Sequence, residues 1–178
     1  SNKGQFASEI CSFGYQGQII CFEPLSDAYQ DLVQKASHKP TLKVHQRTAI
    51  GDFDGEIKIN VAGNSASSSI LPMLKLHTEA DESSAYVATE TAPIARLDSI
   101  ASNYISQSSS LFLKIDTQGF EWQVLDGARD TLKKTQGLLC ELSFVPLYEG
   151  QHLWFDILHR LESEGFTLWA LQPGFVDP

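Results

Sequence analysis

The sequence predicts an α/β fold in which a mostly parallel, doubly wound sheet carries helices on both faces. Short apolar runs alternate along the chain with longer segments whose apolar residues recur at helical spacing. Strands that alternate with helices form parallel sheets, and right-handed crossovers make such sheets doubly wound. A length of 178 residues and an apolar content of 42% suit one domain over residues 1–178.

The first part of the chain shows both periodicities. Apolar residues at helical spacing predict helices over 5–13 and 26–36. Short apolar runs predict strands over 18–22 and 42–50. Alternation of apolar and polar residues over 56–61 predicts a half-exposed antiparallel strand. The chain therefore begins as a succession of helices and strands.

A long segment over 62–92 separates this part from the rest. It is rich in Ser, Ala, Thr and Glu and has no single strong period, so we expect a loop of the functional or mobile kind, which would line an acceptor pocket. The α/β pattern then resumes, with strands expected over 111–115, 138–144 and 167–171 and helices over 122–132 and 152–164.

The charge balance disfavours several partners. Thirteen basic and 22 acidic residues give a net charge of −9, which repels nucleic-acid phosphates and anionic lipids. No apolar run approaches the roughly 20 residues of a membrane-spanning helix, and the first residues have no signal-peptide character. We therefore expect a soluble, cytoplasmic protein without a nucleic-acid or membrane partner; the oligomeric state stays open.

Cysteine and histidine spacing predicts no metal site. Cys11, Cys21 and Cys140 are widely spaced in apolar contexts, which is typical of reduced structural thiols. The histidines show no metal-ligand spacing. We expect no bound metal.

Ligands of doubly wound sheets bind beyond the carboxyl ends of the strands. Asn2 and Gly4, directly before the first predicted helix, resemble the tail of a glycine-rich turn, although a cloning remnant explains the same residues equally well. Glu23 follows a predicted strand about twenty residues later, where a carboxylate can accept ribose hydroxyls. The alternative is a solvated acid at a strand end.

A second polar group falls at the ends of two later strands. Lys114 and Asp116 share one strand face, and a lysine inside an apolar strand needs Asp116 or Glu141 as a partner. A purely structural ion pair is the alternative to a functional site. Glu141 and Ser143 are expected on one face of the next strand as a polar pocket wall. His152 is a candidate proton acceptor, but a lone histidine near a helix start is more often a surface residue or a cap.

Several blocks occur in one order, namely KGQFA, CFEPLSDAYQDL, TAIGDFDGEIKINVAGNSASSSIL, LKIDTQGFEWQVLDGA and ELSFVPLYEGQ. Together they resemble the FkbM-type S-adenosylmethionine-dependent methyltransferases. The resemblance implies a class I, Rossmann-like fold and methyl transfer from S-adenosylmethionine to a hydroxyl of a sugar or secondary metabolite, so a small-molecule or glycan acceptor. Family members also have a strand and a glycine before the position of Asn2 and a closing strand after that of Pro178, and we expect this chain to lack both.

The resemblance also implies roles for individual residues. It assigns Asn2 and Gly4 to the methionine-side turn, Glu23 to the ribose, Ala49, Ile50 and Gly51 to the adenine wall, and Asp116 to the active-site strand end as catalytic and cofactor-binding residue. Gln118, Glu141, Ser143 and His152 are expected to bind the acceptor. A non-catalytic domain that keeps the fold without binding the cofactor is the alternative, and a nicotinamide enzyme is disfavoured because no G-x-G-x-x-G occurs.

Overall fold

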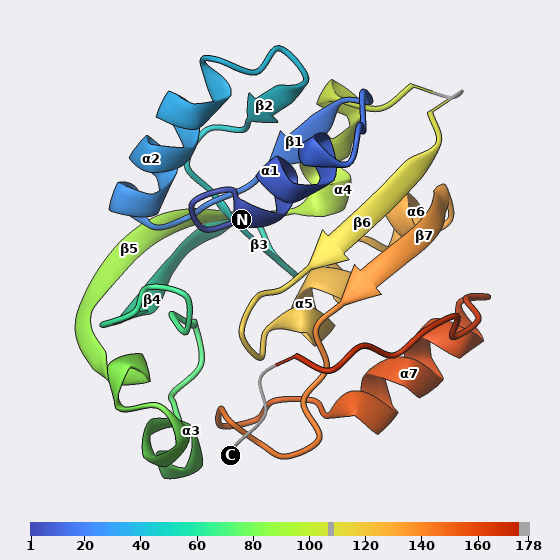
Figure 1. Ribbon diagram of the computed structural model, residues 1–178. Coiled ribbons are helices and arrows are strands. Elements are labelled where there is room, and N and C mark those ends of the chain that lie inside the picture. Colours follow the sequence, from blue (N-terminus) through green and yellow to red (C-terminus); the bar gives the residue numbers. More distant parts are fainter. Residues whose placement is uncertain (107–108, 175–178) are drawn as a thin grey trace.

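The computed structural model describes residues 1–106 and 109–174 and shows an α/β arrangement (Figure 1). The strands are β1 (Ile19–Cys21), β2 (Leu42–Val44), β3 (Ala49–Gly51), β4 (Gly55–Ala62), β5 (Tyr86–Arg96), β6 (Leu111–Ile115) and β7 (Thr135–Cys140). The α-helices are α1 (Gln5–Ser12), α2 (Ser26–Ala36), α3 (Lys75–Ala80), α4 (Leu97–Ile100), α5 (Glu121–Asp126), α6 (Arg129–Leu132) and α7 (Trp154–Ser163), with short 3-10 turns η1 (Glu82–Ser84) and η2 (Ala101–Asn103).

The described strands form three small sheets. β1 pairs with β2 and β6 pairs with β7, both in parallel. In the third sheet β5 lies between β3, to which it is parallel, and β4, to which it is antiparallel. The α/β class is confirmed, but the structure shows separate and partly mixed sheets in place of the expected continuous sheet.

The strand expected over 42–50 is interrupted. Residues 45–48 lie between β2 and β3, although the N–H of His45 still donates to the carbonyl of Cys21 at 2.9 Å and that of Thr48 to Glu23 at 3.3 Å. The segment therefore follows β1 without regular pairing. Its polar residues leave the strand pattern because Arg47 turns to bond neighbouring segments, as described below.

The segment over 62–92 is more ordered than expected. It contains α3, η1 and the first part of β5, which at eleven residues is the longest described strand. Sequence reasoning missed β5 because most of its side chains are exposed and its apolar residues do not alternate regularly with polar ones. Its stability comes from the ladder with β4, which involves residues distant in sequence.

Three further expectations about the second half were wrong. β7 runs over Thr135–Cys140, so residues 141–144 follow the strand. The helix expected over 122–132 is split into α5 and α6. Residues 167–171 form no strand, and the indole of Trp169 is 97% exposed. An apolar run forms a strand only where another strand can pair with it, and these residues have no pairing partner among the residues described.

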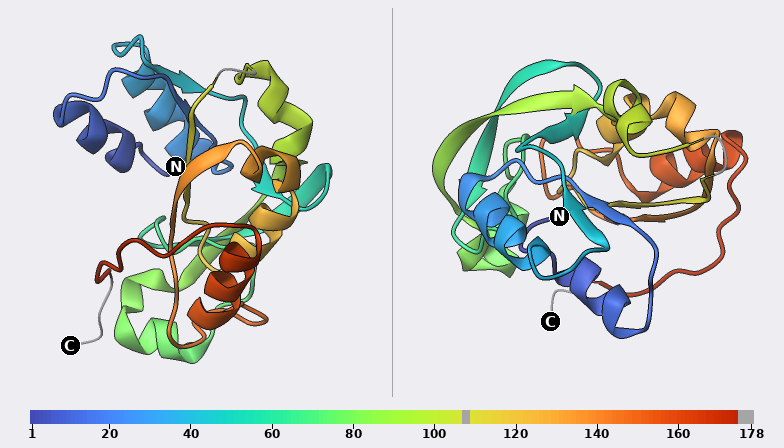
Figure 2. Two further views of the ribbon diagram at one scale, coloured as in Figure 1. Left: turned by 90° about the vertical axis from the view of Figure 1, so that its right-hand side faces the viewer. Right: turned by 90° about the horizontal axis from the view of Figure 1, so that it is seen from above.

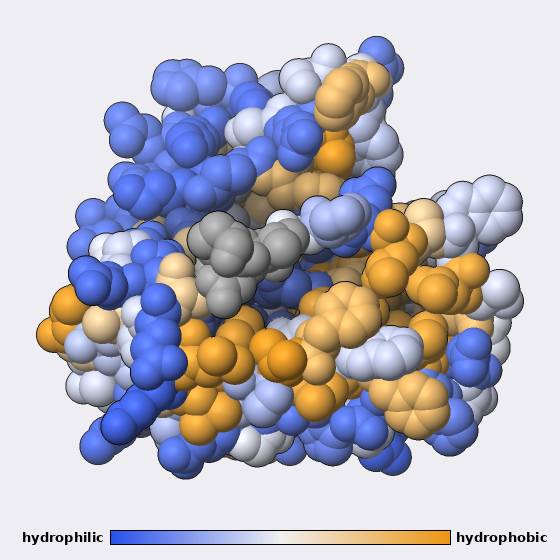
Figure 3. Space-filling model, turned by 60° about the horizontal axis from the view of Figure 1, so that its bottom comes forward, coloured by the Kyte–Doolittle hydropathy of each residue, from blue (hydrophilic) through white to orange (hydrophobic). Residues whose placement is uncertain are grey.

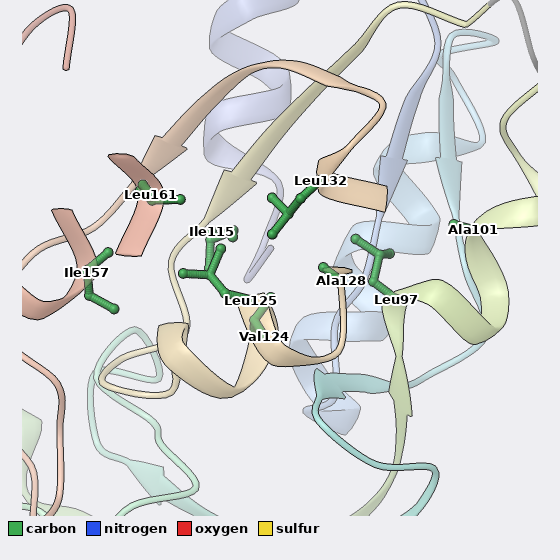
Figure 4. Close-up of a cluster of buried hydrophobic side chains, with 9 residues drawn as sticks. All are labelled: Leu97, Ala101, Ile115, Val124, Leu125, Ala128, Leu132, Ile157 and Leu161. Atoms are coloured by element: carbon green, nitrogen blue, oxygen red, sulfur yellow. The ribbon is translucent and has the colours of Figure 1, made fainter. Parts of the chain in front are cut away.

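The helices lie on both sides of the strands. In Figure 1 α1 lies in front of the strands and α5 and α6 lie behind them, and the views of Figure 2 agree. Behind β6 and β7, Ile115 packs with Val124 and Leu125 of α5 (Figure 4). This cluster also includes Ile157 of α7, so it ties the second half of the chain together. No helix in the described part is long and apolar enough to cross a membrane.

A close backbone contact lies where α5 ends. A Cβ atom on Gly127 would stand 1.8 Å from the carbonyl oxygen of Gly51, which no side chain can do. The carbonyl of Gly127 accepts a hydrogen bond from the N–H of Asp98 at 2.9 Å, which fixes its position. The junction between α5 and α6 is thereby held directly against the end of β3.

Candidate cofactor and active site

Three segments that carry predicted site residues meet in one buried cluster. Leu25 follows Glu23, Ala49 begins β3, and Phe120 follows the turn after β6, and all three belong to the same hydrophobic cluster. The cluster is completed by residues of α2, β4 and β5. Packing in the core therefore brings the segments that follow β1 and β6 against β3, whose last residue, Gly51, also lies next to Phe120.

Glu23 is a buried carboxylate, only 4% exposed. One oxygen, Oε1, accepts the N–H of Leu25 at 3.0 Å. The other, Oε2, accepts the N–H of Asn2 and lies 3.2 Å from the ammonium of Ser1. Backbone N–H groups therefore occupy two of the about four acceptor positions of this carboxylate. The solvated-acid alternative is wrong, and because the carboxylate is buried, a ribose diol that donates two hydrogen bonds would have to displace one of these contacts.

Asn2 and Gly4 form the turn ahead of α1. Both are in the left-handed region, with φ of 47° and 74°. Gly4 is the N-cap of α1, and no side chain caps this helix end. Uncapped N–H groups and the helix dipole favour an anionic group at such an end. A Cβ on Gly4 would lie 2.7 Å from Leu32, so packing as well as conformation requires a glycine here.

The predicted adenine wall is an ordered strand. Ala49 and Gly51 are buried, Ile50 is half-buried, and all three belong to β3. A Cβ on Gly51 would lie 2.6 Å from Ile94 and 2.9 Å from Phe120. The glycine is thus explained by contact with the chain's own core, and the side chain of Ile50 is the one of the three with solvent access.

Arg47 braces this region, and sequence reasoning missed it. Its guanidinium donates to the carbonyl of Pro24 at 3.0 Å and to that of Thr91 at 3.1 Å, and it pairs with Glu90 at 3.3 Å. Glu90 in turn accepts the N–H of Ser26 at 3.0 Å. The turn after Glu23 is therefore tied to β5. An arginine inside a strand-like run was the signal that could have revealed it.

Part of the second polar group forms one network, which joins Lys114, Asp116, Gln118 and Glu141. The ammonium of Lys114 lies 2.5 Å from Asp116, so the lysine has the expected partner. The amide of Gln118 donates to Asp116 at 2.9 Å and to Glu141 at 2.6 Å. Lys114 is exposed on an open strand face, so it is not a buried charge. Its ammonium also lies 5.3 Å from the ring centre of Phe6.

The two carboxylates titrate in opposite directions. Burial raises the pKa of Asp116, but hydrogen bonds from Lys114 and Glu141 and the lysine charge outweigh it, so this pKa lies below its usual value. Burial and then the charge of Asp116 raise the pKa of Glu141 well above its usual value. As the pH rises, Asp116 therefore ionises before Glu141, and the two titrations are coupled.

The turn after β6 is held from two sides. Gln118 and Gly119 are left-handed, with φ of 54° and 93°. The single hydroxyl hydrogen of buried Tyr148 is shared between the Gln118 side-chain oxygen at 3.0 Å and the carbonyl of Ser67 at 3.1 Å. The hydroxyl of Ser69 donates to the Gln118 carbonyl at 2.6 Å. Part of the 62–92 segment therefore borders the carboxylate network.

Ser143 and His152 are not members of this network. Ser143 lies beyond β7, contrary to expectation, and its hydroxyl accepts the side-chain amide of Gln151 at 2.8 Å. The ring of His152 stacks on Trp122, with 4.0 Å between ring centres. Both side chains are thus engaged in packing the segment that leads into α7.

One cavity lies elsewhere. It has a volume of about 650 Å³ between α5, α6 and α7 and contains none of the predicted site residues. Its charged lining is largely self-paired, since Arg160 binds Asp126 at 3.1 Å and Glu164 at 3.0 Å. In the described part of the chain no three His, Cys, Asp or Glu side chains are grouped to hold a metal ion.

Comparison with known proteins identifies the family. The family model described as the methyltransferase FkbM domain matches residues 1–168. No curated protein and no solved structure matches the chain. The match covers almost the whole chain and includes both the Glu23 region and the carboxylate network. The chain belongs to the FkbM methyltransferase family.

Proposed function

We propose that this FkbM-family methyltransferase uses S-adenosylmethionine and methylates a hydroxyl oxygen of a sugar or another small-molecule acceptor, on a Rossmann-like class I fold. The observation that carries the proposal is the common cluster of Leu25, Ala49 and Phe120. It holds the ends of β1, β3 and β6 together, and such strand ends are where nucleoside cofactors bind. The parallel pairs β1–β2 and β6–β7 support the fold assignment.

The residues present suit the cofactor chemically. The uncapped start of α1, with Asn2 and Gly4, suits the amino-acid carboxylate. Glu23 suits the ribose hydroxyls, and half-buried Ile50 suits an adenine face. When bound, the cofactor supplies a methyl group on a positively charged sulfur.

The network around Asp116 suits a hydroxyl-bearing acceptor. Gln118, Asp116 and Glu141 present amide and carboxylate groups at the open ends of β6 and β7. Such groups exchange hydrogen bonds with alcohols. The chain's contribution to rate is to hold the acceptor oxygen in line with the methyl carbon, because orientation supplies much of the barrier reduction in bimolecular reactions.

Binding of S-adenosylhomocysteine tests the cofactor assignment. A ligand at about one hundred times its Kd stabilises the folded protein by about 2.7 kcal/mol. We expect a thermal shift and a saturable calorimetric titration, both weakened by Glu23→Gln, which keeps the side-chain volume. Lys133→Gln is the matched control, because Lys133 is 75% exposed and, among the described residues, forms an ion pair with Asp130 alone. No binding to the unmodified chain at millimolar ligand contradicts the proposal.

A non-catalytic role is the second candidate. Its supporting observation is that Glu23 is buried and already accepts the backbone N–H groups of Asn2 and Leu25. In that case the protein folds and S-adenosylhomocysteine does not bind. The same titration therefore separates the two functions.

Transfer of label from [methyl-³H]S-adenosylmethionine to a panel of methyl glycosides tests the acceptor class. We expect a labelled product that survives mild alkali, because ethers resist the hydrolysis that cleaves methyl esters. Label that is released by alkali identifies a carboxyl acceptor and contradicts the hydroxyl assignment.

A further inference from the structure

The two carboxylates bridged by Gln118 have unequal surroundings. Asp116 is held by the Lys114 ammonium at 2.5 Å and by the Gln118 amide at 2.9 Å. Glu141 accepts the Gln118 amide at 2.6 Å and is hydrogen-bonded to Asp116, but no cation pairs with it in the described part of the chain. One carboxylate is thus a compensated anion, and the other keeps free acceptor positions at the open strand end.

We propose that Glu141 is the general base that takes the proton of the acceptor hydroxyl, and that Asp116 and Gln118 are positioning residues that hold it. This inference rests on the proposed function and reverses the role that the sequence suggested for Asp116. It follows from the geometry, because a carboxylate paired with an ammonium is a weak proton acceptor, whereas an unpaired one at the edge of the site is not.

The electrostatics agree with this division of roles. A general base works best when its pKa lies near the working pH. The titratable or charged groups that face Glu141 are Asp116, Glu121, Lys114, Cys140 and Tyr148. Burial and the charge of Asp116 raise the pKa of Glu141, and only Lys114 opposes them. Asp116, with its lowered pKa, is too weakly basic for the task.

The proposed step balances in atoms and charge. The acceptor hydroxyl gives its proton to the Glu141 carboxylate, and its oxygen forms the new O–C bond to the methyl carbon. The C–S bond breaks, and its electron pair remains on sulfur. One cation and one carboxylate anion are consumed, leaving a neutral thioether, a methyl ether and a neutral carboxyl group, which then loses its proton to water.

A comparison of two ligands tests the inference without any acceptor. S-adenosylmethionine carries a positive sulfonium where S-adenosylhomocysteine is neutral, so an ionised Glu141 close to the methyl group attracts only the former. We expect calorimetry over about pH 6 to 9 to show S-adenosylmethionine affinity rising relative to S-adenosylhomocysteine, on the order of tenfold, as Glu141 ionises. Glu141→Gln should abolish this rise.

Two further variants control the experiment. Glu149→Gln, an exposed carboxylate on the same segment, should behave as the unmodified chain. Asp116→Asn should move the rise to lower pH, because Glu141 loses a neighbouring negative charge. If circular dichroism shows that Glu141→Gln does not fold, the shift in Asp116→Asn still tests whether the ionisation of Glu141 causes the rise in affinity.

The calorimetric results distinguish failure of the Glu141 assignment from failure of the proposed methyltransferase function. If both ligands bind but their affinity ratio is independent of pH, or if Glu141→Gln keeps the rise, the base assignment is overturned while the methyltransferase proposal stands. If neither ligand binds the unmodified chain at any pH, the proposed function fails, and the base assignment fails with it.

Discussion

Local backbone propensity and the tertiary contact with Gly51 predict opposite effects of Gly127→Ala on stability. Gly127 has φ of −81° and ψ of 0°, which alanine adopts freely. Local propensity and chain entropy therefore predict that Gly127→Ala stabilises by about 0.5 to 1 kcal/mol. In the fold, however, the added Cβ would stand 1.8 Å from the Gly51 carbonyl oxygen and 3.3 Å from the Cα of Arg96.

We expect the tertiary contact to outweigh the local preference, so that Gly127→Ala lowers the free energy of unfolding. The gap must open from 1.8 Å to about 3 Å, and overpacking of this kind costs about 1 to 3 kcal/mol when the neighbours can move. Here both neighbours are backbone, and the Asp98 hydrogen bond pins Gly127. We expect a net loss of about 2 kcal/mol or more, and thus a Tm lowered by roughly 4 to 8 °C.

Urea unfolding followed by circular dichroism measures this effect. Gly174→Ala is the control, because a Cβ at Gly174 meets nothing within 4 Å, and we expect less than about 0.5 kcal/mol of change there. An unchanged or increased free energy of unfolding for Gly127→Ala would refute the reasoning, since it would show that the strand end and the helix junction are not in contact.

Three further predictions follow from buried and braced polar groups. Tyr148→Phe should lower the free energy of unfolding by about 1 to 3 kcal/mol in urea titrations, because it removes the hydroxyl that donates to the buried side of Gln118; no change would mean that water replaces the hydroxyl. Glu121 has a pKa raised by burial, so its contribution to stability is present below the unfolded-state pKa and is lost as the pH rises through the folded one. Unfolding at pH 5 and pH 8 should therefore show Glu121→Gln gaining relative to the unmodified chain at the higher pH, and a pH-independent difference would contradict this. Arg47→Gln and Glu90→Gln should each destabilise, with a coupling of about 1 kcal/mol in a double-mutant cycle, and additive effects would show that the pair does not interact.

The carboxylate network and the Glu23 region differ in whether a ligand can bind without displacing part of the chain. Asp116, Gln118 and Glu141 face an open strand end, whereas Glu23 is buried under the turn of Asn2. Occupation of the ribose position therefore requires a small displacement of that turn, while the acceptor side requires none. Figure 3 shows the lower end of the Figure 1 view, where apolar side chains gather next to hydrophilic ones.

The sequence by itself determined the α/β class, most element positions and the strand-end placement of Glu23 and Asp116. Helices α1 and α2 and strands β4 and β6 lie within a residue or so of their predicted bounds. Periodicity is enough to predict these elements, because each buries one face and the residues of that face recur at a regular spacing within one short segment. The Lys114 ion pair was predictable for the same reason, since both members lie on one strand face.

Tertiary structure alone decided the rest. β5 exists through its ladder with β4, β7 ends where its pairing with β6 ends, and residues 167–171 stay unpaired for lack of a neighbouring strand. The partners of Arg47 and the contact at Gly127 join segments tens of residues apart. Pairing, close backbone approach and the coupled ionisation of two carboxylates depend on distances in space, and no local pattern of residues encodes those distances.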